Sequence, residues 1–480
     1  MPTFVAVDLG ATSGRVVNVR IDRDGIGLDH VRRFPNLAVA GPDGDLVWDF
    51  DALLNDVAGG LSEAAAREPA ESVAVDSWAI DYGLLDRDGH RIGQVHAYRS
   101  ARTIGVMDAV CTRVGREHIY GVTGIQFLPF NTAYQLVAAR DTAEYRNAHR
   151  LLMVPDLVNL ALCGSTTNDV TNASTTQLLD VVTRSWSDEL ITELGLRRDV
   201  LPELHEPGTE LGTVRGVEPS VDGLRVIAAA SHDTASAVAG VPLRRDRPAV
   251  YISCGTWSLV GCEVTAPITS REALSANVTN ELGVGGTVRL LKNVTGLWLL
   301  EECRRTWAGQ GRVSDAAELV AAAGSVPGGR SVIDPDDPRF ATPGDMPARI
   351  GEYCHQTGQP VPTSPAEVTR TILDSLALAW RATVSTIEHV AGFEADVIHL
   401  VGGGSSIPLL RELCASACGR PVLAGPAEAT VAGNAIVQAI ASGVLADLAE
   451  GRDLVERTLD LVEVTPRDTL DWDALATRLP

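Results

Sequence analysis

The 480-residue sequence contains a single lysine, Lys292. A P-loop requires the pattern GxxxxGK followed by Ser or Thr, because the lysine contacts phosphate and the hydroxyl contacts Mg²⁺. The residues around Lys292 read VRLLKNVTG, with neither the glycines nor the hydroxyl in place. P-loop phosphate chemistry is therefore excluded.

Cysteine is sparse, with eight scattered residues and no CxxC pair. Structural zinc sites and dithiol redox sites normally use closely spaced cysteines. Cys414 and Cys418 are four residues apart and could share a metal, but no second Cys or His cluster follows them. We expect reduced thiols, most of them buried.

Long hydrophobic runs and positive charge are also scarce. No run of eighteen uncharged apolar residues occurs, and a β-forming stretch begins at Phe4 without a basic and apolar leader, so we expect a cytoplasmic protein without a membrane partner. The net charge of −22 lacks the basic footprint that nucleic acids and anionic membranes require. A polyanionic substrate would need local donors, and Mg²⁺ would supply the missing positive charge.

Two similar hairpins lie 245 residues apart, as the start positions 4 and 249 show, FVAVDLGATSGR at 4–15 and AVYISCGTWSLVG at 249–261. Each has β-forming residues, then Gly and Thr in a tight turn, then more apolar residues. Backbone amides and hydroxyls at such turns suit phosphate oxygens. The repetition predicts a duplicated nucleotide-binding fold with a triphosphate held between the copies.

Strand-like and helical stretches alternate in both halves, which predicts α/β domains with mostly buried sheets. Strand-like runs include 72–86, 224–230 and 397–403, and helical stretches include 52–68 and 365–391. Proline and arginine crowd residues 241–248, which favours a boundary there. We expect an N-terminal domain over 1–243, a C-terminal domain over 244–445, and a helix with a short extension over 446–480.

Asp8 ends the first strand directly before the turn Gly10–Arg15. A carboxylate beside a phosphate-binding turn repels phosphate unless a cation lies between them, so Asp8 is a candidate Mg²⁺ ligand, directly or through water. The alternative is an Asp that bonds its own turn. The duplicated hairpin favours the metal site.

Asp233 lies in AAASHDTASAVAG (228–240), a small-residue strand followed by an alanine-rich helix. It could be only a helix N-cap. With His232 beside it at a strand end, a catalytic carboxylate is favoured. As general base, Asp233 would accept the proton of a hydroxyl that attacks a γ-phosphoryl group.

Two further stretches contain candidate binding residues. DSWAIDY (76–82) is either a plain core strand or a sugar site, in which the Trp78 face packs on C–H groups and Asp81 accepts hydroxyl protons. Asn293 is a polar candidate for the same pocket. In VGGGSSI (401–407), the glycines either let a nucleotide lie on the backbone or make a strand-to-helix turn.

Several segments together resemble the FGGY carbohydrate kinases of the actin and hexokinase superfamily, and within them the branch that phosphorylates L-rhamnulose. The resemblance runs from about residue 4 to about 440. It rests on the two hairpins, VGGGS and KNVTGLWLL, and on the segments 97–103, 120–136, 171–180, 230–238, 254–261 and 428–438. It implies two duplicated ribonuclease H-like (actin-like ATPase) domains with an interdomain cleft.

The resemblance also implies roles for individual residues. Asp233 is the proton acceptor, His232, Thr234 and Asn293 touch the ketose, and the family's sugar contact in the DSWAIDY segment falls on Ala79. Contacts to ATP are implied for Ala11, Thr12, Ser13, Gly14, Arg15, Thr256, Glu301, Gly402 and Gly403. Three departures from the family pattern stand out: Ala79 in place of Gly, Glu301 in place of Gln, and Ser406 and Ile407 in place of Gln and Asn.

The implied activity is transfer of the γ-phosphoryl group of Mg-ATP to the 1-hydroxyl of L-rhamnulose, by a monomer or homodimer. One alternative is a kinase for a related sugar, L-fuculose or L-xylulose. The other, from a different class, is a non-enzymatic ATP-binding protein like actin. The presence of Asp233 within a sugar-kinase motif argues against the actin-like alternative.

Overall fold

The computed structural model describes residues 1–244, 246–312, 315–468 and 470–479. Residue 245, within the expected boundary at 241–248, lies outside the described residues. The chain forms two compact units. The first contains Met1–Pro242, Glu263–Leu290 and Ala429–Leu459, and the second contains Leu243–Cys262, Leu291–Glu428 and Asp460–Pro480. Each unit therefore takes its residues from three separate parts of the sequence.

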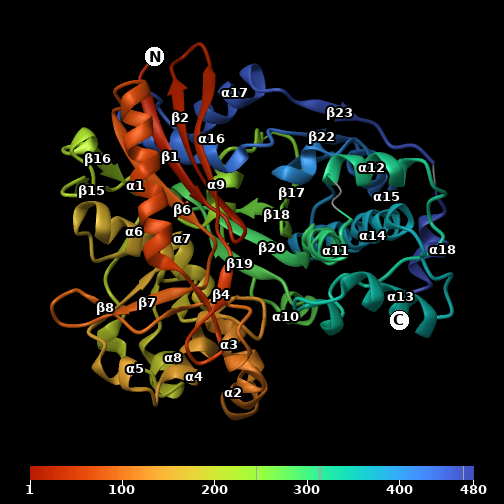
Figure 1. The fold of residues 1–480 in the computed structure, drawn as a ribbon, viewed down its shortest axis with the longest axis horizontal. Coiled ribbons are helices and arrows are strands. Elements are labelled where there is room, and N and C mark those ends of the chain that lie inside the picture. The colour runs from red at the N-terminus through yellow and green to blue at the C-terminus, as the bar shows by residue number, and fades with distance from the viewer. Residues whose placement is uncertain (245, 313–314, 469, 480) are drawn as a thin grey trace. The chain divides into compact units, whose positions relative to one another are not determined.

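A six-stranded sheet forms the centre of the first unit, with the order β15-β16-β6-β1-β2-β3 (Figure 1). β1 pairs antiparallel with β2 and parallel with β6, and β16 lies parallel to β6. The bounds are β1 Thr3–Leu9, β2 Ser13–Ile21, β3 Ile26–Pro35, β6 Ser72–Ser77, β15 Glu210–Thr213 and β16 Arg225–Ile227. Every residue of β1 is buried, as its run of apolar residues predicts for a central strand.

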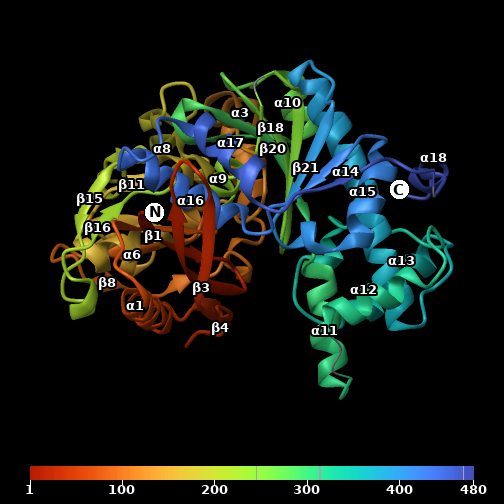
Figure 2. The same cartoon turned by 90° about the horizontal axis from the view of Figure 1, so that it is seen from above.

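Helices cover both faces of this sheet. The side chain of Val16 points towards Gly60 of α1 (Phe50–Arg67), whereas its neighbour Val17 packs in one core cluster with Val431 of α16 (Ala429–Ala441). Successive side chains of a strand point to opposite faces, so α1 and α16 lie on opposite sides of β2, as Figure 2 shows. α9 (Asp233–Ala239) packs closely against α16. In the sequence, α16 is followed by α17 (Leu448–Thr458).

Smaller elements complete the first unit. The short strands are β4 Ala38–Ala40, β5 Leu46–Trp48, β7 Tyr82–Leu85, β8 Arg91–Ile92, β9 Val95–His96, β10 Arg150–Met153, β11 Asn168–Asp169, β12 Leu179–Asp180, β13 Ser185–Trp186, β14 Leu204–His205 and β19 Thr279–Leu282. The helices are α2 Val106–Val114, α3 Arg116–Thr123, α4 Thr132–Ala139, α5 Ala143–Asn147, α6 Val154–Cys163, α7 Val170–Ala173, α8 Asp188–Glu193 and α10 Arg271–Ala276.

A seven-stranded sheet with the order β19-β20-β18-β17-β21-β22-β23 contains the strands of the second unit and repeats the plan of the first sheet. β17 pairs antiparallel with β18 and parallel with β21, and β22 lies parallel to β21. The bounds are β17 Ala249–Cys254, β18 Trp257–Val264, β20 Val288–Thr295, β21 Val397–Val401, β22 Val422–Ala424 and β23 Val462–Val464. The predicted duplication is confirmed, because both hairpins form and each is followed by the same pair of parallel strands.

The helices of the second unit begin at sequence signals that are visible in the chain. α14, Pro365–Ala391, starts with a capping box in which Ser364 and Glu367 satisfy each other's backbone groups, and it ends at Gly392 with φ 72°. The other helices are α11 Trp298–Gly309, α12 Ala316–Gly324, α13 Met346–Gln356, α15 Pro408–Cys418 and α18 Trp472–Ala476.

The predicted strand-like run over 72–86 is divided in two. β6 ends at Ser77, and β7 begins at Tyr82 in a different sheet, where it pairs with β8 and β10. Between them Ile80 has φ 67°, a left-handed conformation that a β-branched residue rarely adopts. A strand cannot pass through such a residue, so the chain turns there.

Candidate active site

Hydrogen bonds and a close packing contact fix the turn between β1 and β2. Gly10 N–H donates to the Ser13 carbonyl, and the Asn36 side chain donates to the Gly10 carbonyl over 2.7 Å. A Cβ on Gly14 would lie 2.2 Å from the ring of Phe34, so only glycine fits there. Ala11, Thr12 and Ser13 remain partly exposed at the tip of this turn.

Carboxylates gather where the parallel strands of the first unit end. Asp8 of β1 and Asp76 of β6 are register partners on adjacent strands, and both are buried. Ser77 forms a bridge to His232, which places Asp233 just beyond the end of the next strand, β16. The carboxyl ends of strands in α/β sheets are the usual position of ligand sites.

These carboxylates influence one another. Burial raises the pKa of Asp76 well above its usual value, and the nearby charge of Asp8 adds to the effect. Asp76 Oδ2 accepts a 2.6 Å hydrogen bond from Asn434, but the buried Oδ1 has no hydrogen-bond partner among the described residues. Asp8 is paired with Arg15, whose Nε lies 2.8 Å from Asp8 Oδ2. Carboxylate oxygens such as these are the ligands that Mg²⁺ prefers in proteins.

Asp233 is the first residue of α9 and keeps 31% of its side chain exposed. Burial raises the pKa of Asp233, and the charge of Asp8 raises it further, although His232 acts in the opposite direction. Thr234 Oγ1 donates to Asp233 Oδ1 over 3.1 Å. The carboxylate therefore remains accessible while its affinity for a proton is increased.

His232 is buried against an ion pair within the first unit. Arg289 and Glu281 lie 3.2 Å apart, and burial alone would raise the pKa of Glu281, but Arg289 holds it below its usual value. Arg289 donates to His232 Nδ1 over 3.2 Å, whereas Glu281 Oε2, at the same distance, has no hydrogen-bonding geometry. The Nδ1 atom of His232 therefore lies within 3.2 Å of both charged groups, and its Nε2 lies 3.4 Å from Asp233 Oδ1.

The turn that divides β6 from β7 is anchored by α4. The Ile80 carbonyl accepts hydrogen bonds from Thr132 Oγ1, over 2.6 Å, and from Gln135. A left-handed non-glycine residue costs on the order of 1–3 kcal/mol, and such residues cluster at functional sites. Ala79, which precedes Ile80, is partly exposed.

Asp81 has no exposed surface, and its two oxygens accept four hydrogen bonds. Oδ2 accepts from the indoles of Trp48 and Trp78, at 2.7 and 3.0 Å, and from the backbone of Tyr98, and Oδ1 accepts from Gln135. The two indole rings lie 4.4 Å apart between centroids. A carboxylate has about four lone-pair sites, so protein groups occupy the hydrogen-bonding capacity of Asp81.

In the second unit, the β17–β18 turn is held by the start of α11. The Thr256 carbonyl accepts from the backbone of Gly296 and Trp298, and Leu297 donates to the Gly255 carbonyl. A Cβ on Gly296 would lie 2.6 Å from the backbone of Trp257, which explains the glycine in KNVTGLWLL. The Thr256 side chain remains partly exposed at the tip.

The glycine triplet after β21 packs against the same hairpin. Gly402 has φ 76°, and a Cβ there would meet the Cys254 carbonyl at 2.9 Å, while a Cβ on Gly404 would lie 2.4 Å from Cys254 Sγ. Gly403, in contrast, is exposed and has open space where a Cβ would be. Glu301 of α11 pairs with Arg304 at 2.6 Å, and Asn293 lies in β20.

Comparison with known proteins identifies the family. The N-terminal domain of the FGGY family of carbohydrate kinases matches residues 3–240, and the C-terminal domain of that family matches residues 250–442. The chain belongs to the FGGY family of carbohydrate kinases. It is therefore an enzyme of the sugar-kinase class, which disfavours the actin-like, non-enzymatic alternative.

Individual FGGY relatives cover nearly the whole chain. A protein named rhamnulokinase from Pectobacterium carotovorum is 44% identical over 98% of this chain and 94% of its own length. A second rhamnulokinase, from Bacteroides thetaiotaomicron, is 41% identical over 98% of this chain and 97% of its own length.

Among solved structures, a xylulose kinase from Lactobacillus acidophilus has a TM-score of 0.78 at 14% identity, covering 99% of this chain and 96% of its own. The glycerol kinase of Plasmodium falciparum has a TM-score of 0.77 at 14% identity, covering 100% of this chain and 97% of its own. These likenesses support the predicted fold class, two domains of the actin-like ATPase fold.

The predicted site residues of this FGGY kinase fall into two groups, one in each unit. In the first unit, the β1–β2 turn, Asp8, His232, Asp233 and Thr234 lie at neighbouring strand ends, and Trp78, Ala79 and Asp81 form the turn after β6. In the second unit, Thr256 and the Gly402–Gly404 turn pack around Cys254.

Four residues near these groups were missing from the sequence-based candidates: Asp76, Glu281, Arg289 and Asn434. A carboxylate at a strand end was a usable signal for Asp76, since it opens the DSWAIDY segment. Arg289 and Glu281 carry no local signal, because their relation to His232 exists only in the folded unit.

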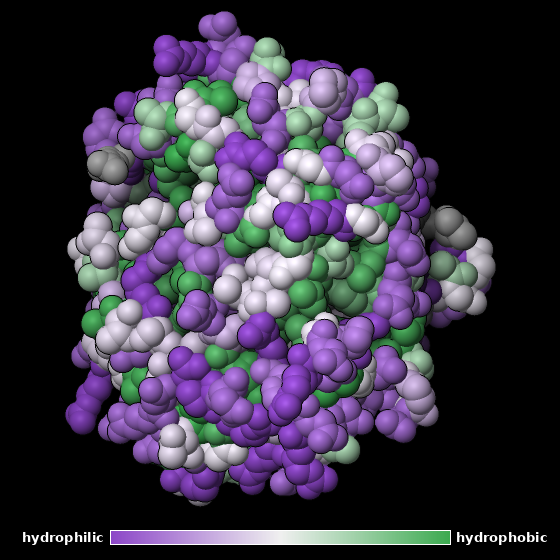
Figure 3. Space-filling view, turned by 90° about the vertical axis from the view of Figure 1, so that its left-hand side faces the viewer, coloured by the Kyte–Doolittle hydropathy of each residue, from purple (hydrophilic) through white to green (hydrophobic). Residues whose placement is uncertain are grey.

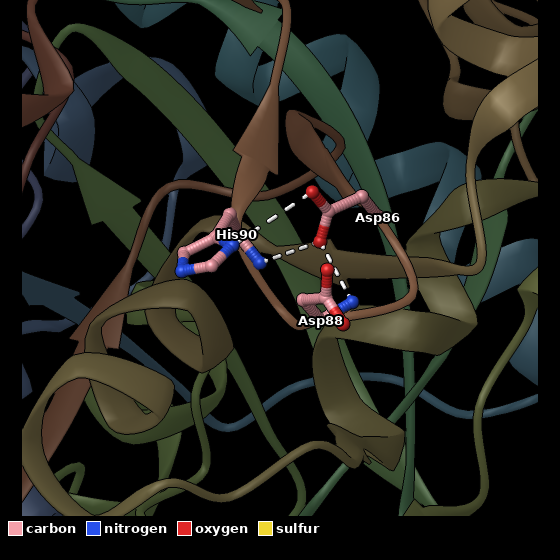
Figure 4. A group of neighbouring side chains, drawn as sticks. All are labelled: Asp86, Asp88 and His90. Carbon is pink, nitrogen blue, oxygen red and sulfur yellow. Dashed lines mark hydrogen bonds and ion pairs between the residues drawn. The ribbon is translucent and has the colours of Figure 1, made fainter.

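A separate acidic group, formed by Asp86, Asp88 and His90, lies at the β7–β8 turn (Figure 4). The Asp86 carboxylate accepts hydrogen bonds from the backbone of Asp88 and His90, both at 2.9 Å. These bonds are typical of an Asx turn and account for the presence of Asp86 without a metal.

Within the described ranges, no helix is both long and apolar enough to span a bilayer.

Proposed function

We propose that this FGGY kinase transfers the γ-phosphoryl group of ATP to the 1-hydroxyl of L-rhamnulose, giving L-rhamnulose 1-phosphate and ADP in L-rhamnose catabolism. The observation that carries the proposal is the 41–44% identity, over 98% of the chain, to relatives named rhamnulokinases. The xylulose and glycerol kinases have similar folds at only 14% identity and so carry no argument about the sugar.

Asp233 acts as general base in this proposal. It accepts the proton of the 1-hydroxyl as that oxygen forms a bond to the γ-phosphorus and the bond to the ADP oxygen breaks. Two features support the role: the carboxylate is accessible at a strand end, and burial raises its pKa. Phosphoryl transfer has a loose transition state that makes modest demands on a base.

The sugar side of the site would consist of His232, Thr234, Asn293, Trp78 and Ala79. His232 would offer Nε2 to a sugar hydroxyl, while Trp78 would offer an aromatic surface to C–H groups. Asp81 fits a supporting role better, because protein donors occupy both of its oxygens. We therefore assign it to orienting Trp78 and the Ala79–Ile80 turn.

The ATP side would comprise residues 11–15 and Thr256 at the phosphates, with Gly402, Gly403 and Glu301 near the nucleoside. The partly exposed tips of both hairpins support this assignment, since exposed backbone amides and hydroxyls suit phosphate oxygens. Gly403 is exposed, and no atom lies within 4 Å of the position that a Cβ would occupy, which leaves room for a flat ligand. In the proposed domain division, residues 1–243 form the sugar and phosphate side and residues 244–445 form the nucleotide side. Residues 446–480 form a C-terminal helix and extension.

A divalent cation, Mg²⁺ in this proposal, fits the residues present. Asp8 and Asp76 are neighbouring carboxylates, and Asp76 Oδ1 is a buried oxygen to which no described residue donates a hydrogen bond. Asp8, directly or through water, and Asp76 would hold the ion. When bound with ATP, Mg²⁺ neutralises part of the phosphate charge.

We also propose a cytoplasmic location, and a monomer or a homodimer. The eight cysteines are all free in the structure, which suits a reducing compartment. ATP, the proposed co-substrate, is made and used there.

The test combines a ketose panel with an Asp233→Asn variant. Purified enzyme with Mg-ATP is assayed for ADP release with L-rhamnulose, L-fuculose and L-xylulose, and we expect the highest kcat/KM with L-rhamnulose. A clear preference for another ketose overturns the substrate, and no sugar-stimulated ADP release overturns the activity.

For Asp233→Asn, we expect kcat to fall by at least 100-fold, since general base catalysis contributes roughly 10²–10⁴-fold. Sugar binding, measured by calorimetry, should change by less than about threefold, because Asn preserves the shape of the side chain. Turnover near the wild-type value would rule out the base assignment.

A further inference from the structure

A buried polar cluster holds the backbone directly before the proposed base. It is centred on Asp169, the last residue of β11 and the N-cap of α7. Ser231 donates to Asp169 Oδ1 through its backbone N–H, over 3.0 Å, and through its hydroxyl, over 3.1 Å. Ser77 N–H donates to the Ser231 carbonyl over 2.8 Å. Every polar group of Ser231 is therefore held.

Thr171 extends this hold to the next residue. Its hydroxyl donates to Asp169 Oδ1 in a short hydrogen bond and accepts the backbone N–H of His232 over 3.2 Å. The Thr171 backbone also donates to Asp169 Oδ1, over 3.0 Å. Asp169 and Thr171 are both completely buried. We refer to Asp169, Thr171 and Ser231 as the Asp169 clamp.

The base itself has little to hold it. Among the described residues, the Asp233 carboxylate accepts one hydrogen bond, from its neighbour Thr234, and lies 3.4 Å from His232. Its position therefore depends on the direction in which the backbone leaves His232. The hydrogen bonds on Ser231 N–H and His232 N–H, which both lead to the clamp, help to fix that direction.

We infer that Asp169 is a positioning residue, which acts through the clamp to place the Asp233 carboxylate for phosphoryl transfer. The inference rests on the proposed function, in which Asp233 is the base. It gives a role to segment 171–180, which was part of the family resemblance without an assigned task. A misplacement of about 1 Å at a reacting group can cost on the order of 100-fold in rate.

The distribution of hydrogen bonds on Asp169 provides a matched pair of variants. The bonds of the clamp go to Oδ1, whereas within the described part of the chain the buried Oδ2 has no hydrogen-bond partner. Asp169→Asn keeps an oxygen acceptor for the clamp, and Asp169→Ala removes it. We expect Asp169→Ala to lower kcat by 10- to 100-fold and Asp169→Asn to stay within about threefold of wild type.

A double-mutant cycle separates positioning from general damage. If the clamp acts through the Asp233 carboxylate, adding Asp169→Ala to Asp233→Asn should lower the residual kcat by less than about threefold. A smaller folded fraction would instead lower the activity in both backgrounds by the same factor. Equal losses in both backgrounds, or an unchanged kcat in Asp169→Ala, would overturn the inference.

A second pair covers the case in which Asp169→Ala does not fold. Thr171→Val replaces the hydroxyl with a methyl group and leaves His232 N–H without its acceptor, while Thr171→Ser keeps the hydroxyl. We expect a fall in kcat of at least fivefold for Thr171→Val and less than twofold for Thr171→Ser. Equal kcat values in the two variants contradict the clamp.

Failure of the clamp and failure of the proposed function give different results. If the function is wrong, wild type is inactive on the ketose panel or Asp233→Asn retains turnover. If only the clamp is wrong, Asp233→Asn loses turnover while Asp169→Ala retains it.

Discussion

The Asp81 carboxylate is buried among four hydrogen-bond donors, two of them tryptophan indoles. Burial raises its pKa to about 6, although the four donors each act to lower it. The charge of Asp81 therefore changes near pH 6, within the range in which most proteins are studied. The neighbouring residue, Ile80, has the left-handed backbone conformation described above.

The sign of the resulting pH effect follows from linkage. The pKa of Asp81 is higher in the folded than in the unfolded chain, so the folded chain binds the proton more tightly between about pH 4 and 6. The contribution of Asp81 to the free energy of unfolding is therefore greatest below this range and falls as pH rises through 6.

We expect the free energy of unfolding of wild type, relative to Asp81→Asn, to fall between pH 4 and pH 7. Urea denaturation of both proteins across this range isolates Asp81 from the other buried acids, which both proteins share. At pH 7, Asp81→Asn should still cost about 1–3 kcal/mol, because its amide group meets protein donors. A difference that rises with pH would contradict the assignment.

At the scale of elements, α9 and α16 approach each other through glycines. A Cβ on Gly433 would lie 1.8 Å from the Ser236 carbonyl, and one on Gly240 would lie 2.2 Å from the Ala429 carbonyl. Asn434, next to Gly433, holds Asp76. The close contact therefore links the helix that begins with the base to the carboxylate cluster.

We expect Gly433→Ala to lower the free energy of unfolding by about 1–3 kcal/mol and to lower kcat, since α9 must move away from α16. Gly121→Ala in α3 is the matched control. No atom lies within 4 Å of its added Cβ, so it should be neutral or stabilising by up to about 1 kcal/mol. Urea denaturation and sugar-dependent ADP release measure both effects. Equal stability of the two variants would show that the helices can separate without cost.

At the scale of the whole molecule, the net charge of −22 is the dominant long-range feature. Hydrophilic residues cover much of the face in Figure 3, with hydrophobic ones scattered among them. Such a field repels anionic ligands, and the repulsion weakens as salt shortens the Debye length from about 30 Å at 0.01 M to about 8 Å at 0.15 M.

We expect the KM for Mg-ATP to fall by about two- to fivefold between these ionic strengths. The KM for the ketose is the internal control and should not change, because the sugar is uncharged. Initial rates at both ionic strengths, with each substrate varied in turn, test this. A rise in the KM for Mg-ATP would show that local cationic groups such as Arg15 outweigh the net charge.

Much of the architecture was readable from local pattern. The two hairpins and the helices over 52–68 and 365–391 form where apolar runs and turn residues predict them. These features depend on neighbours in the sequence, where strand pairing across a tight turn and helix capping involve only a few residues. The positions of Asp8 and Asp233 followed from local pattern as well, since Asp8 lies near the end of a recognisable strand and Asp233 begins the helix after a small-residue strand.

Other features were decided by tertiary structure. The turn at Ile80 divides the strand-like run over 72–86, because α4 and the buried Asp81 hold a conformation that local propensity disfavours. Residues 263–290 and 429–459 join the first unit and supply Glu281, Arg289 and Asn434 to the surroundings of His232 and Asp76. The sequence by itself determined the duplicated strands and the acids at their ends. Only the folded chain determined what surrounds those acids, since burial and hydrogen bonding there depend on residues hundreds of positions away.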